Sequence, residues 1–438
     1  MKTNHSLLYS FLLLNCTIGC DPANGQTISY FTDIQPIVRA TCTGCHRSNG
    51  MAPFPLMTYD DLAKRGNSIA SVTQKKYMPP WRADTAYSSF SNQCVLTNDQ
   101  IRIIGSWVNS GMKKGRVAKT DIQKEQHAAL IDHPADLELS LNKPFKVAGD
   151  NADAFMVFKI PFELSTPENV EAIEFFCNNH KIVHHANFGF WLVNEQADLY
   201  RGDDRVDLLN NSAAYFQFDT LAKKQVYYTG WIPGTTYESY PPGMGWTLPK
   251  KGVMLLYIHF APIGANENFK GGVKLFFTRQ KIEREIRIIN IGTGGVGDID
   301  PPLFIRAGAV SSFTASVATR QDQSILYVWP HMHLLGNSFK AYAVSPAGDT
   351  IHLVSIPKWD FNWQWLYRFR KLVHIPAGSV IYVKANYDNT SNNPLNPNDP
   401  PKAVFSDSRG IMQTKDEMLN LLMIYVNYLP GDEDIPIE

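Results

Sequence analysis

Short runs of β-branched and aromatic residues, each bounded by turn signals, recur along the chain from about residue 140 to its end. This repetition restricts the possible folds more than any other feature, because such runs predict the strands of antiparallel sandwiches. The 29 Gly and 27 Pro residues are spread widely and supply the intervening turns. An all-α protein is disfavoured, and we expect strands at residues 155–160, 185–193, 253–260, 325–333, 379–387 and 420–428.

Chain length and charge limit the domain organisation and the partners. The β-rich part holds about 300 residues, which exceeds one sandwich core, so we divide it into domains at residues 140–280 and 281–438. The chain carries 41 Lys and Arg residues against 41 Asp and Glu residues, and its formal net charge is zero. We therefore expect no nucleic-acid partner.

Residues 1–20 have the shape of a signal peptide, with Lys2 before an apolar run at residues 7–14. This run is too short to span a bilayer, and no later stretch reaches the ~18 apolar residues of a membrane helix. The closing sequence Thr17-Ile18-Gly19-Cys20 resembles a relaxed bacterial lipobox. We expect export to the periplasm or cell surface of a bacterium, with a lipid anchor on Cys20 as the one membrane contact. The alternative is a soluble secreted protein with a free Cys20.

The segment Thr41-Cys42-Thr43-Gly44-Cys45-His46 contains the motif C-x-x-C-H. Two thiols at this spacing form thioether bonds to haem vinyl groups, and the adjacent imidazole binds the iron. A redox C-x-x-C pair would not need His46, and a zinc site would need a second Cys/His pair nearby, which is missing. The motif predicts one covalently attached haem c on Cys42, Cys45 and His46.

Helical patterns lie on both sides of this motif. Ile34, Ile37 and Val38 precede it at helical spacing. A second helix is expected over residues 97–108, because Thr97 and Gln100 have capping-box spacing and the following apolar residues lie on one face. These patterns resemble the first and last helices of a small class I cytochrome c, and we assign residues 21–115 to such a domain.

Met78 is the expected sixth ligand of the haem iron. It lies in Tyr77-Met78-Pro79-Pro80-Trp81, where two prolines restrict the backbone. Met51 and Met57 are rival ligands, and a packing role for Met78 is the alternative. The polar residues 116–139 then form a linker to the β-rich part.

The sequence Pro330-His331-Met332-His333 places two imidazoles on one face of an expected strand, where they can bind one metal ion. A third ligand is needed. Met418, in Asp416-Glu417-Met418-Leu419-Asn420, offers a thioether at the start of the last strand. Imidazole together with thioether selects copper, particularly cuprous copper.

A second group of histidines consists of the pair His184-His185 and the single His259. Adjacent strand residues point to opposite faces, so the pair can share one ion only at a bulge, at a strand end or through different ring nitrogens. His259 is our candidate for the third imidazole, and His180 is a weaker rival. For His127, His133, His352 and His374 we expect structural roles.

The order His-His, single His, His-x-His, Asp-Glu-Met-x-Asn resembles the copper type II, ascorbate-dependent monooxygenases over roughly residues 140–430. The resemblance implies two jelly-roll-like sandwiches, each holding one copper ion. His184, His185 and His259 would bind an electron-transferring copper. His331, His333 and Met418 would bind the copper at which O2 is activated for hydroxylation of a C–H bond. The whole chain is then multidomain, with a small all-α cytochrome c-like domain before two all-β sandwich domains.

This chain departs from the family at the positions that hold a peptide substrate. Peptide-hydroxylating members bind the substrate carboxylate with an Arg and a Tyr, and Trp329 and Leu422 occupy those positions here, although Asn420 remains. Animal relatives are also rich in disulfides, whereas this region contains only Cys177, whose pairing with Cys94 stays open. The substrate is therefore an unidentified small molecule or peptide-like compound.

The fusion of a haem domain to a copper protein suggests an electron relay. A copper monooxygenase consumes single electrons, and a tethered c-type haem delivers them in place of, or from, ascorbate or a redox protein. The sequence thus predicts a copper monooxygenase with two copper ions and one haem c. The alternatives are an electron-transfer protein, or a surface-binding lipoprotein without hydroxylase activity.

Overall fold

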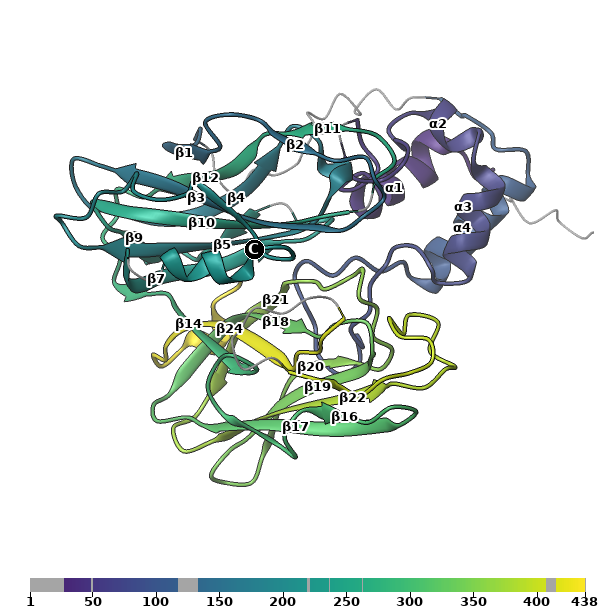
Figure 1. The fold of residues 1–438 in the computed structure, drawn as a ribbon. Coiled ribbons are helices and arrows are strands. Elements are labelled where there is room, and N and C mark those ends of the chain that lie inside the picture. The colour runs from purple at the N-terminus through teal and green to yellow at the C-terminus, as the bar shows by residue number, and fades with distance from the viewer. Residues whose placement is uncertain are drawn as a thin grey trace, which may run out of the picture.

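The computed structural model describes residues 27–48, 50–116, 133–218, 221–235, 237–261, 263–406 and 415–437. The predicted signal peptide, the lipobox cysteine and most of the predicted linker, including His127, lie outside these residues. Within them the protein is mostly β, with several antiparallel sheets and a small N-terminal helical region (Figure 1). None of the helices described has the length and apolarity needed to cross a membrane.

The helical region is built around the two predicted helices. The second of them is the longest, and it has the predicted capping box, in which Thr97 and Gln100 exchange side-chain and backbone hydrogen bonds. Trp107 lies at its buried face and is fully enclosed, and the helix stops before Gly111, whose φ of +85° suits glycine. The helices are the π-helical turn η1 (Tyr30–Ile34), α1 (Gln35–Thr41), α2 (Tyr59–Ala63), α3 (Gly66–Gln74) and α4 (Asn98–Asn109).

The strands that follow form a first sandwich. One sheet has the order β1-β12-β4-β9-β13 with β8 beside β4, the facing sheet has the order β6-β3-β10-β5-β7, and β2 pairs with β11. Short 3₁₀ turns η2 (His180–Ile182) and η3 (Ser212–Phe218) lie between strands. The strands are β1 (Leu137–Ser140), β2 (Phe145–Val147), β3 (Ala154–Glu163), β4 (Glu168–Cys177), β5 (Val183–Val193), β6 (Arg205–Asp207), β7 (Ala222–Trp231), β8 (Tyr237–Ser239), β9 (Met244–Leu248), β10 (Lys251–Phe260), β11 (Glu267–Phe269), β12 (Gly271–Phe277) and β13 (Arg284–Glu285).

The remaining strands form a second sandwich. Its sheets have the orders β14-β24-β18-β21 and β15-β17-β22-β19-β20, and β16 pairs with β23. The 3₁₀ turn η4 (Asp432–Asp434) follows the last strand. The strands are β14 (Arg287–Gly292), β15 (Asp298–Asp300), β16 (Phe304–Ile305), β17 (Val310–Ala318), β18 (Gln323–His331), β19 (Gly336–Val344), β20 (Thr350–Ile356), β21 (Tyr367–Ile375), β22 (Val380–Asp388), β23 (Val404–Phe405) and β24 (Asn420–Asn427).

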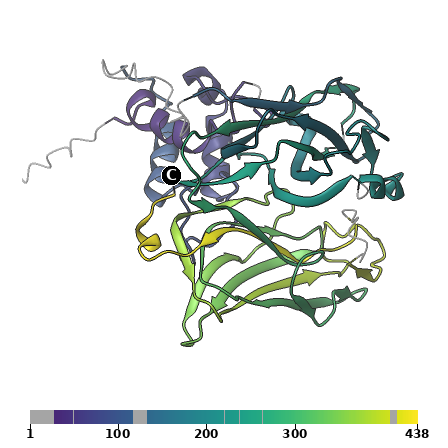
Figure 2. The ribbon, with the colours of Figure 1, turned by 90° about the vertical axis from the view of Figure 1, so that its left-hand side faces the viewer.

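All six predicted strands are confirmed, as β3, β5, β10, β18, β22 and β24. Several of them are central in their sheets and are buried on both faces, which explains their nearly continuous apolar sequences. The two sandwiches lie one above the other in Figure 1, and one hydrophobic core cluster contains residues of both. The helices have a separate core and lie at one end of the molecule, as Figures 1 and 2 show.

One segment of the helical region belongs to the sandwich core. Trp81 packs against Phe90, Trp365 and Tyr367, with ring centroids 5.1–6.0 Å apart. The backbone N–H groups of residues 84 and 91 donate to the carbonyls of residues 355 and 368, both at 2.8 Å. Residues 80–92 therefore attach the helical region to the second sandwich.

Candidate metal centres

The first candidate centre consists of His184, His185 and His259. His259 on β10 lies opposite His185 on β5, and the pairing then shifts so that Phe260 lies opposite Val183. His184 is the extra residue of this β-bulge. The bulge allows the imidazoles of two adjacent strand residues to point to the same place. The nitrogens of the three imidazoles lie within 4.8 Å of one another.

The nitrogens of this centre are oriented for a shared ion. Nδ1 of His184 and Nδ1 of His185 are 3.0 Å apart, which is about the separation of two ligands that each lie ~2.0 Å from one metal ion. Nε2 of His259 is 3.0 Å from the Asp153 carboxylate, and this interaction leaves Nδ1 of His259 for a ligand. His180, the rival ligand, instead packs against Trp231, with ring centroids 5.3 Å apart.

Burial keeps the imidazoles of His184 and His185 neutral near pH 7. Desolvation, assisted by the neighbouring His259, lowers the pKa of His184 to about 4. The same two causes hold the pKa of His185 well below its usual value. A neutral imidazole has the lone pair that a metal ion needs, so both side chains are in the ligating form.

The second candidate centre contains His331, at the end of β18, and His333. Nδ1 of His331 hydrogen-bonds the side-chain oxygen of Gln364, and Nδ1 of His333 donates to the carbonyl of Asp416 at 2.9 Å. Because both acceptors are carbonyl oxygens, both Nδ1 atoms carry the proton and both Nε2 atoms retain a lone pair. Burial lowers the pKa of His331 to about 3, so this imidazole too is neutral.

Glu417 connects Met418 to these histidines. Its buried carboxylate accepts hydrogen bonds from the backbone N–H groups of His333 at 2.9 Å, Leu335 at 2.7 Å and Met418 at 3.3 Å. Burial raises the pKa of Glu417 to about 8 despite these donors. The bonds to His333 and Leu335 hold two chain segments, 84 and 82 residues apart in sequence, against each other. Met418 consequently lines the same cavity as His331 and His333.

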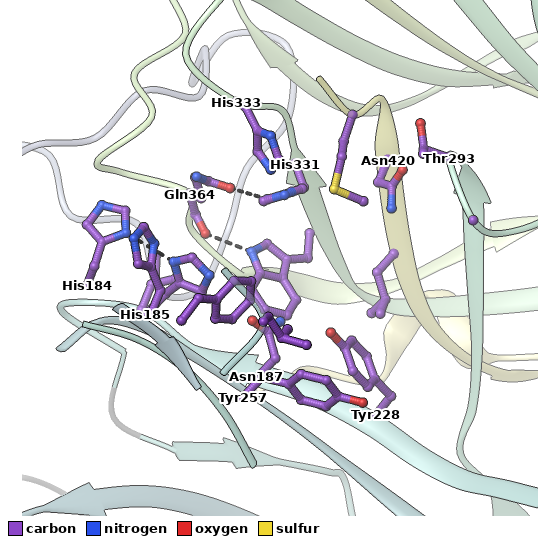
Figure 3. A pocket seen from close by; sticks show the side chains of 18 of the residues that line it. His184, His185, Asn187, Tyr228, Tyr257, Thr293, His331, His333, Gln364 and Asn420 are labelled. Carbon is purple, nitrogen blue, oxygen red and sulfur yellow. Dashed lines mark hydrogen bonds between the residues drawn. The ribbon is translucent and has the colours of Figure 1, made fainter. Parts of the chain in front are cut away.

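Both centres line one cavity of about 630 Å³ between the sandwiches. Figure 3 shows His184 and His185 on one side of this cavity and His331 and His333 on the other. Phe361 lies between the two groups, because its ring stacks on His184 at 5.1 Å and lies edge-on to His333 at 6.1 Å. The arrangement therefore presents two separate sets of donors to a shared space.

The C-x-x-C-H motif follows α1, where the geometry of His46 suits an axial haem ligand. Nδ1 of His46 lies 2.9 Å from the carbonyl oxygen of Phe54, and this bond leaves Nε2 for an iron ion. Cys42 and Cys45 are partly buried thiols, and desolvation raises the pKa of Cys45 to about 11.

Met78 follows α3, and its backbone N–H donates to the carbonyl of Val72 at 3.2 Å. Nothing in the described structure joins Met78 to His46, so its axial role stays a prediction.

The described cysteines form no disulfide. The Cys94 thiol donates to the carbonyl of Thr41 at 3.2 Å, beside the C-x-x-C-H motif. Cys177 lies at the end of β4, opposite Gly271 of β12. The pairing that the sequence left open is therefore absent in the structure.

Sequence reasoning missed four residues around the centres: Asp153, Phe361, Gln364 and Glu417. Glu417 lies inside the motif that pointed to Met418, so its neighbours gave a signal for it. Asp153, Phe361 and Gln364 belong to loops without any pattern. They reach the centres only because the sheets bring distant loops to the same cavity.

Comparison with known proteins gives little further information. No protein-family model matches this chain, and no curated protein sequence matches it. Among solved structures, PNGF-II is similar with a TM-score of 0.29 and 8% identity, over 66% of this chain and 65% of that one. This chain thus spans just under two thirds of PNGF-II. The infectious bursal disease virus VP2 subviral particle is similar with a TM-score of 0.18 and 10% identity, over 69% of this chain and 75% of that one.

Proposed function

We propose that this protein is a copper-dependent monooxygenase that hydroxylates a C–H bond of an organic substrate. The observation that carries the proposal is the convergence of two sets of soft donors, one from each sandwich, on a single cavity. His184, His185 and His259 form one set, and His331, His333 and Met418 form the other. A purely structural metal site would not need to open onto a shared space of about 630 Å³.

The donor sets suit copper. Three imidazoles fit a copper ion that changes oxidation state, and two imidazoles with a thioether favour the cuprous ion. A blue copper centre is not expected, since no cysteine lines the cavity in the described part of the chain. Zinc would be served by the three histidines, but Met418 is a poor zinc ligand.

In this proposal the protein residues divide the work. Copper, when bound, supplies the activation of O2 and one-electron transfer. His331, His333 and Met418 hold one ion, and Glu417 positions two of these ligands through the backbone. The overall reaction is R–H, O2, two electrons and two protons giving R–OH and water, so a reductant must supply both electrons.

The position of the C-x-x-C-H motif supports a haem relay. The Cys45 sulfur and the Trp365 ring both lie within 3.3 Å of the point that a Cβ atom on Gly234 would occupy. Trp365 directly follows Gln364, whose side chain hydrogen-bonds His331. We propose that a haem c on Cys42, Cys45 and His46 passes electrons to the copper ions over this short route. The remaining expectations, export and a lipid anchor on Cys20, belong to the same proposal.

Copper and haem analysis of the purified full chain tests the proposal first. We expect two copper ions and one haem per chain, and uptake of O2 that depends on both substrate and reductant. Met418→Ala should abolish hydroxylation and leave the haem spectrum unchanged. Met332→Leu is the matched control, because Met332 lies between His331 and His333 in sequence, is buried, and is not among the described residues that line the cavity. Two copper ions without any coupled O2 uptake would favour the electron-transfer alternative.

Rapid mixing tests the relay. After reduction, the haem of the full chain should be oxidised faster than in an untethered mixture of haem domain and copper domains at equal concentration. Equal rates would show that the attachment does not serve electron delivery.

A further inference from the structure

We propose that the cavity binds an uncharged molecule with a planar apolar body and a hydroxyl or N–H group, and that it excludes carboxylates. The inference rests on the proposed function, since it names the substrate class of that site. It follows from the side chains that lie one row beyond the metal ligands on each sandwich.

The second sandwich offers an apolar row. His331 of β18 lies opposite Asn420 of β24, and Trp329 lies opposite Leu422. Residues two positions apart on a strand share a face, so the pair Trp329 and Leu422 adjoins the pair that carries the metal ligand. All four residues line the cavity. Trp329 and Leu422 therefore offer an apolar surface next to His331 for a substrate carbon.

The first sandwich offers a polar aromatic row in the same way. His259 of β10 lies opposite His185 of β5, and Tyr257 lies opposite Asn187. Tyr257 and Asn187 also line the cavity, and Figure 3 shows them beyond His185. The Tyr257 hydroxyl lies 2.6 Å from the Tyr215 hydroxyl. The space between the two rows thus has one apolar wall and one wall of hydroxyl and amide groups.

The Trp329 ring forms part of the cavity wall and is held in place by its neighbours. Its indole N–H donates to the carbonyl of Gln364 at 2.8 Å, so the indole has no donor left for a ligand. Its ring edge abuts Gly230 on β7 of the first sandwich, where an added Cβ would lie 2.2 Å from the Trp329 ring. Because Gly230 has no side chain, the Trp329 ring can pack against it, and the ring presents an apolar surface to the cavity.

The charges of the lining argue against an anionic ligand. Apart from the histidines, Asp153 and Lys415 are the only residues with a charged side chain among the described residues that line the cavity. Asp153 is engaged by His259, and Lys415 is exposed, so its ammonium group is solvated. A carboxylate inside the cavity would lose its hydration, no buried cationic side chain among the described residues would replace it, and a cuprous ion, which prefers soft ligands, is a poor partner for it.

Two unpartnered polar atoms indicate the groups that the ligand supplies. Among the described residues, Oδ1 of Asn420 and Nε1 of Trp191 are buried and have no hydrogen-bond partner, and both residues line the cavity. Oδ1 of Asn420 needs a donor, which a hydroxyl or N–H group on the ligand provides. Since Asn420 lies opposite His331, this donor fixes the ligand next to the second metal centre.

Equilibrium binding to the full chain loaded with cuprous copper, in the absence of O2, tests the inference, because no turnover can occur and the cuprous ion is a poor partner for a carboxylate. The probes are 2-phenylethanol, ethylbenzene and phenylacetate, monitored by titration calorimetry. We expect 2-phenylethanol to bind at least about tenfold more tightly than either of the others, because only it has both the apolar body and the donor. Phenylacetate binding as tightly as the alcohol, or binding of none of the three, would overturn the inference.

Variants assign the effect to the two rows. Asn420→Leu should weaken 2-phenylethanol about tenfold and leave ethylbenzene unchanged, and Trp329→Arg should make phenylacetate the preferred probe. Trp246→Phe is the control for a buried tryptophan outside the cavity, and its binding should match the unmodified protein. Unchanged preferences in Asn420→Leu and Trp329→Arg would contradict the assignment. A protein that binds the alcohol but never hydroxylates any substrate would refute the proposed function and leave this inference standing.

Discussion

Glu417 shows how one side chain can organise a site that it does not enter. Its carboxylate is completely buried, faces three backbone N–H groups and contacts no cation among the described residues. Desolvation opposes its ionisation and outweighs the three donors, so the pKa of Glu417 is raised. The hydrogen bonds form a fixed connection between the segments that carry His333 and Met418.

Glu417→Gln should therefore destabilise the fold although the side chain keeps its shape. The amide places N–H groups against one or more backbone N–H groups, and an unmet buried donor costs about 2 kcal/mol. Urea unfolding of the copper-free protein measures this cost. Glu163→Gln at the exposed end of β3 is the control and should change the free energy of unfolding by less than about 0.5 kcal/mol. An equally small change in the free energy of unfolding for Glu417→Gln would show that Glu417 does not hold the two chain segments together.

Asp153 has the corresponding role for the first centre. It accepts from Nε2 of His259, and this bond, the largest cause, lowers the pKa of the Asp153 carboxyl group. Asp153→Asn should weaken copper binding at the first centre by about 10-fold or more, because the imidazole loses its charged orienting partner. Competition with a copper chelator measures the affinity, and the exposed Asp150→Asn serves as the comparison. Equal affinities in the two variants would count against this role.

At the scale of elements, the histidine pair shows both the reach and the limit of sequence reasoning. The spacing predicted that His184 and His185 can share an ion only at a bulge, at a strand end or through different ring nitrogens, and the pairing of β5 with β10 contains a bulge. The strands themselves were predictable because their apolar runs are long and bounded by turns. Gln364, Phe361 and Asp153 were not, because loop residues obtain their neighbours only from the packing of whole sheets.

The C-terminal turn η4 is tied to β13 by an ion pair. Asp432, nearly inaccessible, accepts two hydrogen bonds from the Arg284 guanidinium, at 2.6 and 2.7 Å, and another from Ser324. Burial alone would raise the pKa of Asp432, but the hydrogen bonds from Arg284 and Ser324 outweigh it and lower the pKa. Because β13 pairs with β9, this ion pair fastens the end of the chain to the first sandwich.

Asp432→Asn should lower the free energy of unfolding by about 3 kcal/mol, since it leaves a partly buried guanidinium without its counter-charge. A carboxyl group with a lowered pKa stabilises the fold above its unfolded pKa of about 3.9 and loses that contribution as the pH falls toward its folded pKa. The unmodified protein should thus lose stability below about pH 4 more steeply than Asp432→Asn. Denaturant unfolding as a function of pH measures both, and parallel curves would contradict the assignment.

At the scale of the whole molecule, residues 80–92 determine where the helical region lies. Trp81 inserts among aromatic rings of the second sandwich, and Arg82 forms an ion pair with Asp360 at 2.5 Å. This attachment brings the C-x-x-C-H motif to Trp365 and Gly234. Sequence analysis assigned this segment to a haem domain and gave no sign that it packs elsewhere, because its contacts lie more than 250 residues away in sequence.

Trp81→Ala should loosen this attachment without unfolding the sandwiches. The loss of ring contacts removes roughly 3 kcal/mol from the packing of the segment. Hydrogen exchange should become faster at the backbone N–H groups of Asp84 and Ser91, which bond the second sandwich, while β18 stays protected. Tyr77→Ala is the matched control, because Tyr77 is an exposed aromatic residue four positions earlier. Equal exchange in the two variants would show that Trp81 does not hold the segment.

The apolar core that runs through both sandwiches limits how the two candidate metal centres can move. A hinge that parted the sandwiches would expose side chains packed across the boundary, among them Trp329 against Gly230. Such an opening would cost free energy in proportion to the apolar area brought into water. The packing between the two sandwiches therefore fixes the separation of the two candidate centres.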